Sequence, residues 1–288
     1  MTNTLRDLVG PGRLASVMSA HNPLSARLAE LAGFDGIWAS GFELSAAYGV
    51  PDASLLSFIQ HLDMTRAIVE RVSAPVVADL DTAYGNAVNV MHVVGAHASA
   101  GGAAVVIEDK TFPKDTSLLA GGRQDLVRVE EFQGKIAAAL TAGTQRDLLV
   151  VARTEALIAD LGIDEALRRA SAYTEAGADM ILLHSKQKTP AEIVAFSRRW
   201  QGRTRLVVVP TAYPDLTEAR IRELGNIGMV IYGNHAVRAA VTAMRQVFTE
   251  IRTDGGIHNV DKHIVSVEEI FELQRVTEMN AIEREFLR

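Results

Sequence analysis

Pro75-Val-Val-Ala-Asp-Leu-Asp81 is a continuous apolar run that ends in acidic residues, and the pattern returns in Ala103-Ala-Val-Val-Ile-Glu108 and Leu148-Leu-Val-Val-Ala-Arg153. None of the three runs alternates apolar and polar residues, which is typical of parallel strands covered on both faces. The longer segments between them place apolar residues three and four apart, which is the spacing of amphipathic helices. The middle of the chain therefore predicts alternating strands and helices of an α/β protein.

The same alternation extends in both directions along the chain. Eight strands are expected at residues 14–20, 36–40, 75–81, 103–108, 148–153, 180–184, 206–210 and 229–232. Eight helices are expected at residues 25–32, 57–72, 88–100, 129–141, 163–176, 190–200, 217–224 and 236–252. This pattern predicts a (β/α)₈ TIM barrel. An open doubly wound sheet is the alternative, but the first strand ends in Ala20-His21-Asn22-Pro23 and lacks the Gly-rich turn typical of that fold.

A helical extension is expected after the barrel. We assign residues 1–256 to the barrel and residues 257–288 to the extension. Ser266-Val-Glu-Glu269 predicts a helix start with a capping acid. One or two amphipathic helices follow, marked by Ile270, Leu273, Met279, Ile282 and Phe286. This arm is expected to pack either on its own barrel or on a neighbouring subunit.

Composition excludes several classes of function. The net charge is −6 and no Lys/Arg block is present, so nucleic acid is not an expected partner. The chain has no cysteine, which excludes disulfides, thiolate metal sites and a cysteine nucleophile. No signal-peptide pattern and no run of roughly 18 apolar residues is present. A soluble cytoplasmic protein with no membrane partner is expected.

Charged residues follow three of the predicted strands. In a barrel of this kind, the active site forms where the strands end. Asp79 and Asp81 are two apart and, within a strand, would point to one face, with Glu108 on the next strand. Three convergent carboxylates repel each other unless a cation neutralises them, and oxygen ligands favour Mg²⁺ or Mn²⁺ over Zn²⁺. The alternative is that these acids pair with Lys110, Lys114 or Arg153.

Other polar residues at the expected rim are less specific. Arg153 is either a partner for a nearby acid or a fork that binds a carboxylate or phosphonate. His184 is either a buried structural histidine or a functional one. Ser40-Gly41 suits a carboxylate, although Ser-Gly is common in turns.

A long loop, residues 110–122, follows the fourth strand. Such loops often close over a substrate, although a mobile solvated loop has the same composition. Its plausible inward-facing groups are Lys114, Thr116 and Ser117.

Taken together, these stretches resemble the phosphoenolpyruvate mutase/isocitrate lyase superfamily over nearly the whole chain. The matching segments are Gly36-Ile-Trp-Ala-Ser-Gly41, Val50-Pro-Asp52, Asp79-Leu-Asp81, Glu108-Asp-Lys110, Phe112-Pro-Lys114, Val151-Ala-Arg-Thr-Glu155 and His184-Ser185. The resemblance implies a barrel whose C-terminal helix is swapped between subunits, in a homotetramer built as a dimer of swapped dimers.

The resemblance also implies residue roles. Asp79 would bind Mg²⁺ directly, Asp81 and Glu108 would hold its waters, and Mn²⁺ or Co²⁺ could substitute. Asp52 would lie close to the metal and the substrate. The other implied substrate contacts are Ser40 and Gly41 for the carboxylate, Trp38 as an aromatic wall, Arg153 for carboxylate or phosphoryl oxygens, and Lys114, Ser117 and His184 for the phosphoryl group.

The lid distinguishes among activities within this superfamily. The lyases carry a lid cysteine, which this chain lacks, and Phe112-Pro-Lys114 resembles the members that act on phosphonates. Mutases have an asparagine at the position of Thr116. The resemblance therefore implies hydrolysis of the C–P bond of a small-molecule phosphonate 2-oxo acid, phosphonopyruvate, to pyruvate and phosphate. Asp52, His184 and Thr116 all remain candidates for handling the water proton.

Three other activities stay open at this stage. The first is phosphonopyruvate/phosphoenolpyruvate interconversion. The second is decarboxylation or C–C hydrolysis of oxaloacetate-type acids, against which the lid sequence argues. The third is a catalytically silent barrel used for binding or assembly, against which the charged rim argues.

Overall fold

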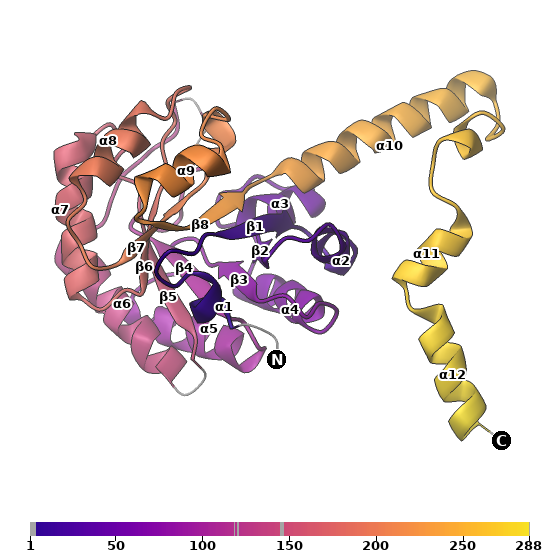
Figure 1. The fold of residues 1–288 in the computed structure, drawn as a ribbon, viewed down its shortest axis with the longest axis horizontal. Coiled ribbons are helices and arrows are strands. Elements are labelled where there is room, and N and C mark those ends of the chain that lie inside the picture. The colour runs from indigo at the N-terminus through magenta and orange to yellow at the C-terminus, as the bar shows by residue number, and fades with distance from the viewer. Residues whose placement is uncertain (1–3, 118, 120, 145–146, 288) are drawn as a thin grey trace. The chain divides into compact units, whose positions relative to one another are not determined.

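A closed barrel of eight parallel strands forms the N-terminal part of the chain (Figure 1). The computed structural model describes residues 4–117, 119, 121–144 and 147–287. The strands follow one another around the barrel in chain order. They are β1 (Ala15–Ala20), β2 (Gly36–Ala39), β3 (Val76–Asp79), β4 (Ala104–Glu108), β5 (Leu149–Thr154), β6 (Met180–Leu183), β7 (Arg205–Val208) and β8 (Ile227–Tyr232). The predicted (β/α)₈ barrel is confirmed, and the open sheet is excluded.

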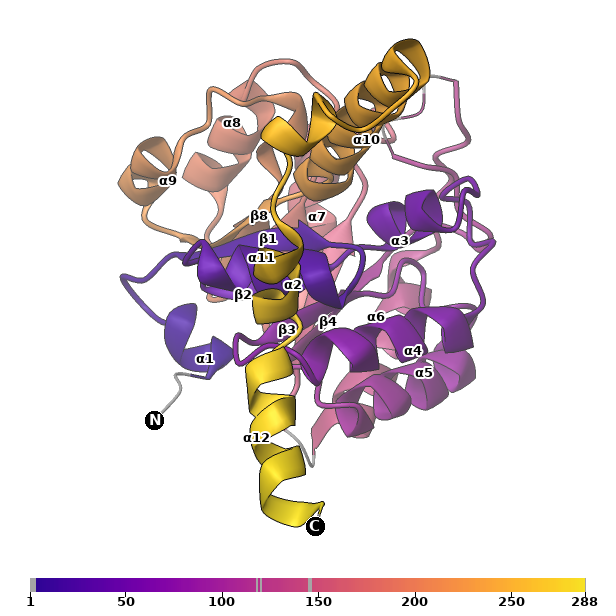
Figure 2. The ribbon, with the colours of Figure 1, turned by 90° about the vertical axis from the view of Figure 1, so that its right-hand side faces the viewer.

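Helices surround this barrel. Figure 1 shows α4, α5 and α6 in succession on its outside, and Figure 2 shows α4 and α5 side by side. The helices of this part are α1 (Leu5–Leu8), α2 (Pro23–Leu31), α3 (Gly41–Ala47), α4 (Phe58–Val69), α5 (Ala87–Ser99), α6 (Val129–Gly143), α7 (Gly162–Glu175), α8 (Ala191–Arg199) and α9 (Glu218–Leu224), with the 3₁₀ turn η2 (Pro210–Ala212). α2 begins before the predicted residue 25, because Asn22 caps it and Pro23 occupies its first turn. α1 and α3 were not predicted.

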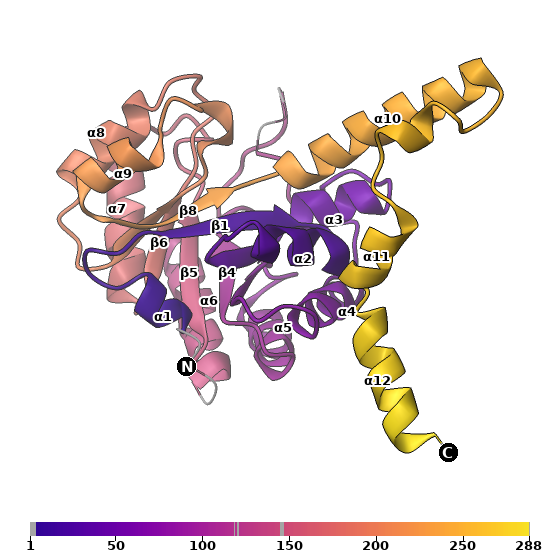
Figure 3. The ribbon, with the colours of Figure 1, turned by 45° about the vertical axis from the view of Figure 1, so that its right-hand side comes forward.

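The strands separate two layers of core. In β4, Val106 belongs to the core inside the barrel, whereas Val105 and Ile107 pack between the strands and the helices. Figure 3 shows the strands from the side. Because side chains alternate along a strand, Glu108 lies on the same face as Val106. The inward-facing rows therefore end in charged residues at the carboxyl ends of the strands.

The register of the strands brings these ends together. Glu108 pairs with Arg153 across β4 and β5, and Asp79 pairs with Val106 across β3 and β4. Beyond β3, the backbone amide of Glu108 donates to the carbonyl of Asp81 at 2.7 Å, which holds the turn after β3 against β4. The fold thus gathers groups from three separate strands at one rim.

The C-terminal part forms a second compact unit. By internal contacts the chain divides between Ala236 and Val237, whereas the sequence placed the end of the barrel domain at residue 256. This unit contains most of α10 (His235–Asp254), followed by η3 (Val260–Lys262), α11 (Val267–Leu273) and α12 (Val276–Phe286). Ser266 is the expected N-cap, because its hydroxyl accepts from the amide of Glu269 at 3.1 Å. In the described part of the chain, no helix combines the length and apolar character needed to cross a membrane.

Candidate active site

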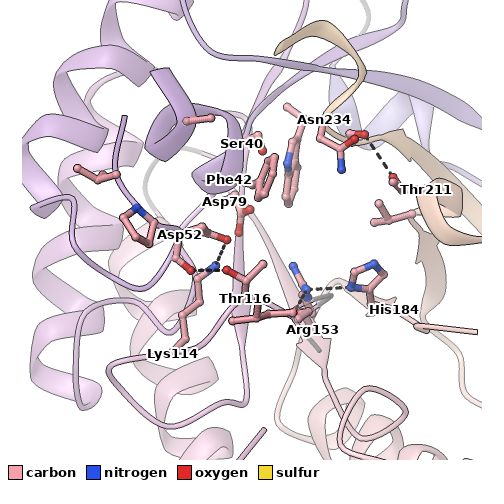
Figure 4. A pocket seen from close by; sticks show the side chains of 18 residues that line it. Ser40, Phe42, Asp52, Asp79, Lys114, Thr116, Arg153, His184, Thr211 and Asn234 are labelled. Carbon is pink, nitrogen blue, oxygen red and sulfur yellow. Dashed lines mark hydrogen bonds and ion pairs between the residues drawn. The ribbon is translucent and has the colours of Figure 1, made fainter. Parts of the chain in front are cut away.

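A cavity of about 560 Å³ opens at the carboxyl ends of the strands (Figure 4). Trp38 comes from β2, Asp79 ends β3, Arg153 lies in β5 and His184 follows β6. The segment after α3 and the loop after β4 cover the other side. The full lining is Trp38, Ser40, Phe42, Ala46, Val50, Pro51, Asp52, Asp79, Lys114, Thr116, Ser117, Leu119, Arg153, His184, Val209, Thr211, Gly233 and Asn234.

One side of the cavity is acidic and is bridged by a lysine of the loop after β4. The ammonium of Lys114 donates to Asp81 Oδ1 at 2.5 Å and to Asp52 Oδ2 at 3.1 Å. Burial alone would lower the pKa of Lys114, but attraction to Asp81 and Asp52 raises it well above its usual range. Burial raises the pKa of Asp79 to about 6 even though Lys114 and Arg153 oppose that shift. These acids are therefore crowded, and a single ammonium does not fully neutralise them.

Glu108 lies below this acidic side and is 1% exposed. Both of its carboxylate oxygens lack a hydrogen-bond partner within the described ranges, and the Arg153 guanidinium nitrogen Nε lies 3.4 Å from Oε2. A buried carboxylate without donors is costly. No set of three metal-binding side chains already stands at coordination distance in the part of the chain that is described. The chemistry of Asp79, Asp81 and Glu108, oxygen donors with unmet charge, nevertheless fits a hard divalent cation such as Mg²⁺.

Asp81 reaches this site by a different route from the one expected. β3 ends at Asp79, and Asp81 has a left-handed backbone with φ +52°, so strand alternation does not align the two side chains. The turn after β3 brings the two side chains together instead, and it lies against the start of α3 at Gly41. A Cβ atom at Gly41 would lie 3.0 Å from Asp81 Oδ1, so a larger residue there would require the Asp81 carboxylate to shift by a few tenths of an ångström.

The opposite side of the cavity is basic. The Arg153 nitrogen Nη2 donates to Ser117 Oγ at 3.0 Å and to His184 Nδ1 at 3.1 Å, while Nε donates to Glu155 Oε1 at 2.5 Å. Burial, with the charge of Arg153, lowers the pKa of His184 to about 3, so the ring is neutral. Since Nδ1 accepts, Nε2 carries the hydrogen, and it has no protein partner among the described residues. His184 thus offers a hydrogen-bond donor and is not suited to accept a proton.

The loop after β4 is attached to the barrel at several points. Thr116 donates its hydroxyl hydrogen to the carbonyl of Asp52 at 2.8 Å, and the amide of Lys114 donates to Ser54 Oγ at 3.2 Å. Ser117 donates to Glu155 Oε2 at 2.6 Å. These contacts favour a lid that covers the cavity over a solvated loop. Residues 118 and 120 of this lid lie outside the described residues.

Two residues expected to contact the substrate have protein partners of their own in the structure. The ammonium of Lys114, expected beside the phosphoryl group, pairs with Asp52 and Asp81 on the acidic side of the cavity. Ser40 lines the cavity, but its hydroxyl accepts from the amide of Glu43 at 3.2 Å and caps α3. The amide of Gly41 donates to Asp79 Oδ2 at 3.3 Å.

Several residues at the site were not singled out from the sequence. Thr211 and Asn234 line the cavity, and their only signal was their position after the seventh and eighth predicted strands. Phe42 lies on α3, a helix too short for a clear apolar period. Glu155 is fully buried and pairs with Arg153 and Lys110. Its charge alone did not indicate which cations would be its partners.

The chain is similar in sequence and in fold to known proteins. The sequence model of the family described as phosphoenolpyruvate phosphomutase matches residues 5–252. The chain is 61% identical over 284 residues to the phosphonopyruvate hydrolase of Variovorax sp. (strain Pal2), covering 99% of this chain and 98% of that protein. It is 41% identical over 286 residues to the phosphoenolpyruvate phosphomutase of Tetrahymena pyriformis, covering 99% and 95%. A crystal structure of phosphonopyruvate hydrolase in complex with oxalate and Mg²⁺ matches with a TM-score of 0.92 and 61% identity, covering 96% of this chain and 95% of that one.

Proposed function

Since the chain belongs to the phosphoenolpyruvate phosphomutase family, we propose that it catalyses the Mg²⁺-dependent hydrolysis of phosphonopyruvate to pyruvate and phosphate. The observation that carries this proposal is the much higher identity to a hydrolase of that substrate than to the mutases, over the same length of chain. The lid supports it, because Thr116, which stands where the family resemblance implies an asparagine in the mutases, lines the cavity.

The C–P bond of phosphonopyruvate can break heterolytically, and this site suits that reaction. The carbon bonded to phosphorus is next to a ketone, so cleavage of the C–P bond leaves its electron pair as a pyruvate enolate. Asp79, Asp81 and Glu108 are the residues that would hold Mg²⁺. When bound, the ion supplies positive charge where negative charge develops on the enolate. Trp38 would provide an apolar wall beside the carbon skeleton.

The basic side of the cavity would bind the phosphoryl group. Transfer of this group needs positioning and charge neutralisation more than covalent help from the protein. Arg153 Nη1 has no partner among the described residues, and Arg153 lines the cavity. Together with His184 Nε2–H, it gives donors that suit phosphoryl oxygens.

Besides a stabilised enolate and a bound phosphoryl group, hydrolysis requires a water molecule in line with the C–P bond. The Thr116 hydroxyl already donates to the Asp52 carbonyl, so its oxygen can accept a hydrogen bond from that water. The neutral, donating state of His184 argues against it as the base. We therefore assign Thr116 to orienting the water and Asp52, whose carboxylate lines the cavity, to receiving its proton. Attack of the water oxygen on phosphorus breaks the C–P bond, with the enolate as the leaving group, and forms phosphate. The proton taken from the water balances the protonation of the enolate carbon, which gives pyruvate.

A product assay tests this function. Incubation of the protein with Mg²⁺ and phosphonopyruvate is followed by ³¹P NMR, with pyruvate measured in parallel. Equal amounts of phosphate and pyruvate are expected. Phosphoenolpyruvate as the product would identify a mutase, and no phosphorus-containing product with turnover of oxaloacetate would identify a decarboxylase or C–C hydrolase. An absence of turnover on both substrates would favour a silent barrel.

We also propose that the chain assembles as a homotetramer of swapped dimers and works in the cytoplasm. Support for the assembly comes from apolar side chains that are exposed in the single chain. On the C-terminal helices they include Phe248, Phe271, Ile282 and Phe286, and on α2 they include Leu24, Leu28 and Leu31. Large apolar side chains exposed in this way mark protein interfaces when they lie together on a surface.

A further inference from the structure

We propose that Glu155 is a positioning residue whose buried carboxylate orients Arg153 and anchors the lid at Ser117. One side chain thereby fixes the positions of both residues. The inference rests on the proposed function, because it concerns the guanidinium that would bind the phosphoryl group. Glu155 does not line the cavity and is fully buried. It would act only through the residues that it holds.

The two oxygens of this carboxylate have separate partners. Oε1 accepts from Arg153 Nε at 2.5 Å, and Oε2 accepts from the Ser117 hydroxyl at 2.6 Å. Arg153 and Ser117 also contact each other at 3.0 Å. One rigid carboxylate therefore fixes a side chain of β5 and a residue of the lid in a single arrangement.

Lys110 strengthens the attachment on the lid side. Its ammonium is 3.4 Å from Glu155 Oε2 and donates to Ser117 Oγ at 2.9 Å and to the Asp115 carbonyl at 2.8 Å. Lys110 is 1% exposed, so its charge depends on Glu155 for compensation. Burial would raise the pKa of Glu155, but Arg153 and Lys110 lower it to about 2, so the carboxylate is ionised at neutral pH.

Glu155 is itself fixed from behind. Its amide donates to Asp109 Oδ1 at 2.8 Å, and Asp109 Oδ2 accepts from the Tyr173 hydroxyl at 2.7 Å and from Arg169 at 3.1 Å. These partners are all buried. Because the backbone of Glu155 is held in this way, we expect its carboxylate to stay in place and the lid to move when the contact between them forms.

The first test is Glu155→Gln. The amide oxygen can still accept from Arg153, but the amide nitrogen would place a donor toward Lys110 and Ser117. Hydrogen bonds to charged groups contribute about 1.5–3 kcal/mol, so tryptic cleavage within residues 110–123 is expected to rise by roughly ten- to a hundredfold. We expect kcat/KM for phosphonopyruvate to fall mainly through a higher KM. Glu30→Gln is the matched control, since Glu30 also pairs with an arginine but lies on α2, and neither measurement is expected to change.

The second test is Ser117→Ala, which removes the lid contact but leaves Glu155 paired with Lys110 and Arg153. This variant tests the proposal even if Glu155→Gln does not fold. The same rise in lid cleavage is expected, with little change in Tm. In the double variant, the loss of kcat/KM should be smaller than the product of the two single losses, because both changes break one contact.

Lid cleavage at the wild-type rate in either folded variant would overturn the proposal, as would fully multiplicative losses in the double variant. A lower kcat with unchanged KM and unchanged lid cleavage would indicate a merely structural role. Cleavage of the lid does not require turnover. A wild-type protein that fails to hydrolyse phosphonopyruvate therefore contradicts the proposed function and leaves the lid result to be judged separately.

Discussion

Two lysines of the lid, four positions apart, pair with different buried carboxylates. Lys114 meets Asp81 and Asp52, whereas Lys110 meets Glu155 and Ser117. Each lysine is buried, so its place is set by the carboxylate that it can pair with. The lid therefore places one cation on the acidic side of the cavity and uses the other as part of its attachment.

At Asp79, the crowding of acids leads to a prediction about Mg²⁺. The buried carboxylate has a pKa raised to about 6, and a bound cation would favour its ionised form. Mg²⁺ should raise the Tm of the wild-type protein but not that of Asp79→Ala, and the variant should lose at least about a hundredfold in kcat/KM. Thermal shift with and without Mg²⁺ measures the first effect. Equal Mg²⁺-dependent shifts in both proteins would rule out Asp79 as a ligand.

At Thr116, the prediction concerns the choice of acceptor for the phosphoryl group. In Thr116→Asn, an amide replaces the hydroxyl that would orient the water, and it could hold the phosphoryl group for return to the enolate oxygen. Phosphate release should fall and phosphoenolpyruvate should appear, as measured by ³¹P NMR. Full hydrolysis without phosphoenolpyruvate would show that residue 116 does not control the acceptor. Thr111→Asn, at the base of the lid and outside the cavity lining, serves as the control.

At the scale of elements, helices α4 and α5 meet through a buried histidine pair. His61 Nδ1 lies 3.2 Å from His97 Nε2, and His97 Nδ1 donates to the Val93 carbonyl at 2.9 Å. His97 Nε2 is therefore an acceptor, and a further proton would place two donors face to face. Burial lowers the pKa of His97 to about 4, and burial with the His97 ring lowers that of His61 to about 3.

This pair predicts a loss of stability in acid. The ordinary histidine value is 6.5 and the folded value is lower, so the unfolded chain binds protons first as the pH falls. The stabilising contribution of the neutral pair is present above pH 6.5 and is lost as the pH falls from 6.5 to about 4 for His97 and to about 3 for His61. His97 contributes about 2 kcal/mol of this loss by pH 5. The decrease in unfolding free energy from pH 7 to pH 5, measured with urea, should be smaller by about that amount in His97→Gln.

A matched control lies on the same helix. His92 is exposed on α5, and His92→Gln should show the same decrease as the wild-type protein. If His97→Gln also follows the wild-type protein between pH 7 and pH 5, the buried pair is not the source of the acid sensitivity. Protein concentration is kept constant, because assembly would also affect the apparent stability.

At the scale of the whole molecule, the C-terminal helices predict assembly. α12 exposes Ile282 and Phe286, which are 59% and 71% accessible in the single chain. Light scattering should give a tetrameric mass for the wild-type protein and a smaller mass for Ile282→Glu, because a charge would be buried in the interface. Thr277→Glu adds the same charge to another face of α12 and should leave the mass unchanged. A monomeric wild-type protein, or an unchanged mass in Ile282→Glu, would contradict the proposed assembly.

The local sequence pattern was sufficient to predict the barrel. The runs ending at Asp79, Glu108 and Arg153 are apolar throughout, and this pattern depends only on which residues are buried along each strand. The absence of cysteine and the identity of residue 116 were likewise properties of the sequence alone. The short helix α3 could not be predicted, because seven residues with a serine cap carry too little periodic signal.

Only the tertiary structure decided which charges meet. Lys110, Lys114 and Arg153 were equally plausible partners for the acids, since a long side chain can reach several neighbours and sequence spacing does not rank them. Register across β4 and β5, the left-handed turn at Asp81 and the path of the lid made the choice. Burial then fixed the outcome, because a charge removed from water is stable only beside the partner that the fold places within reach.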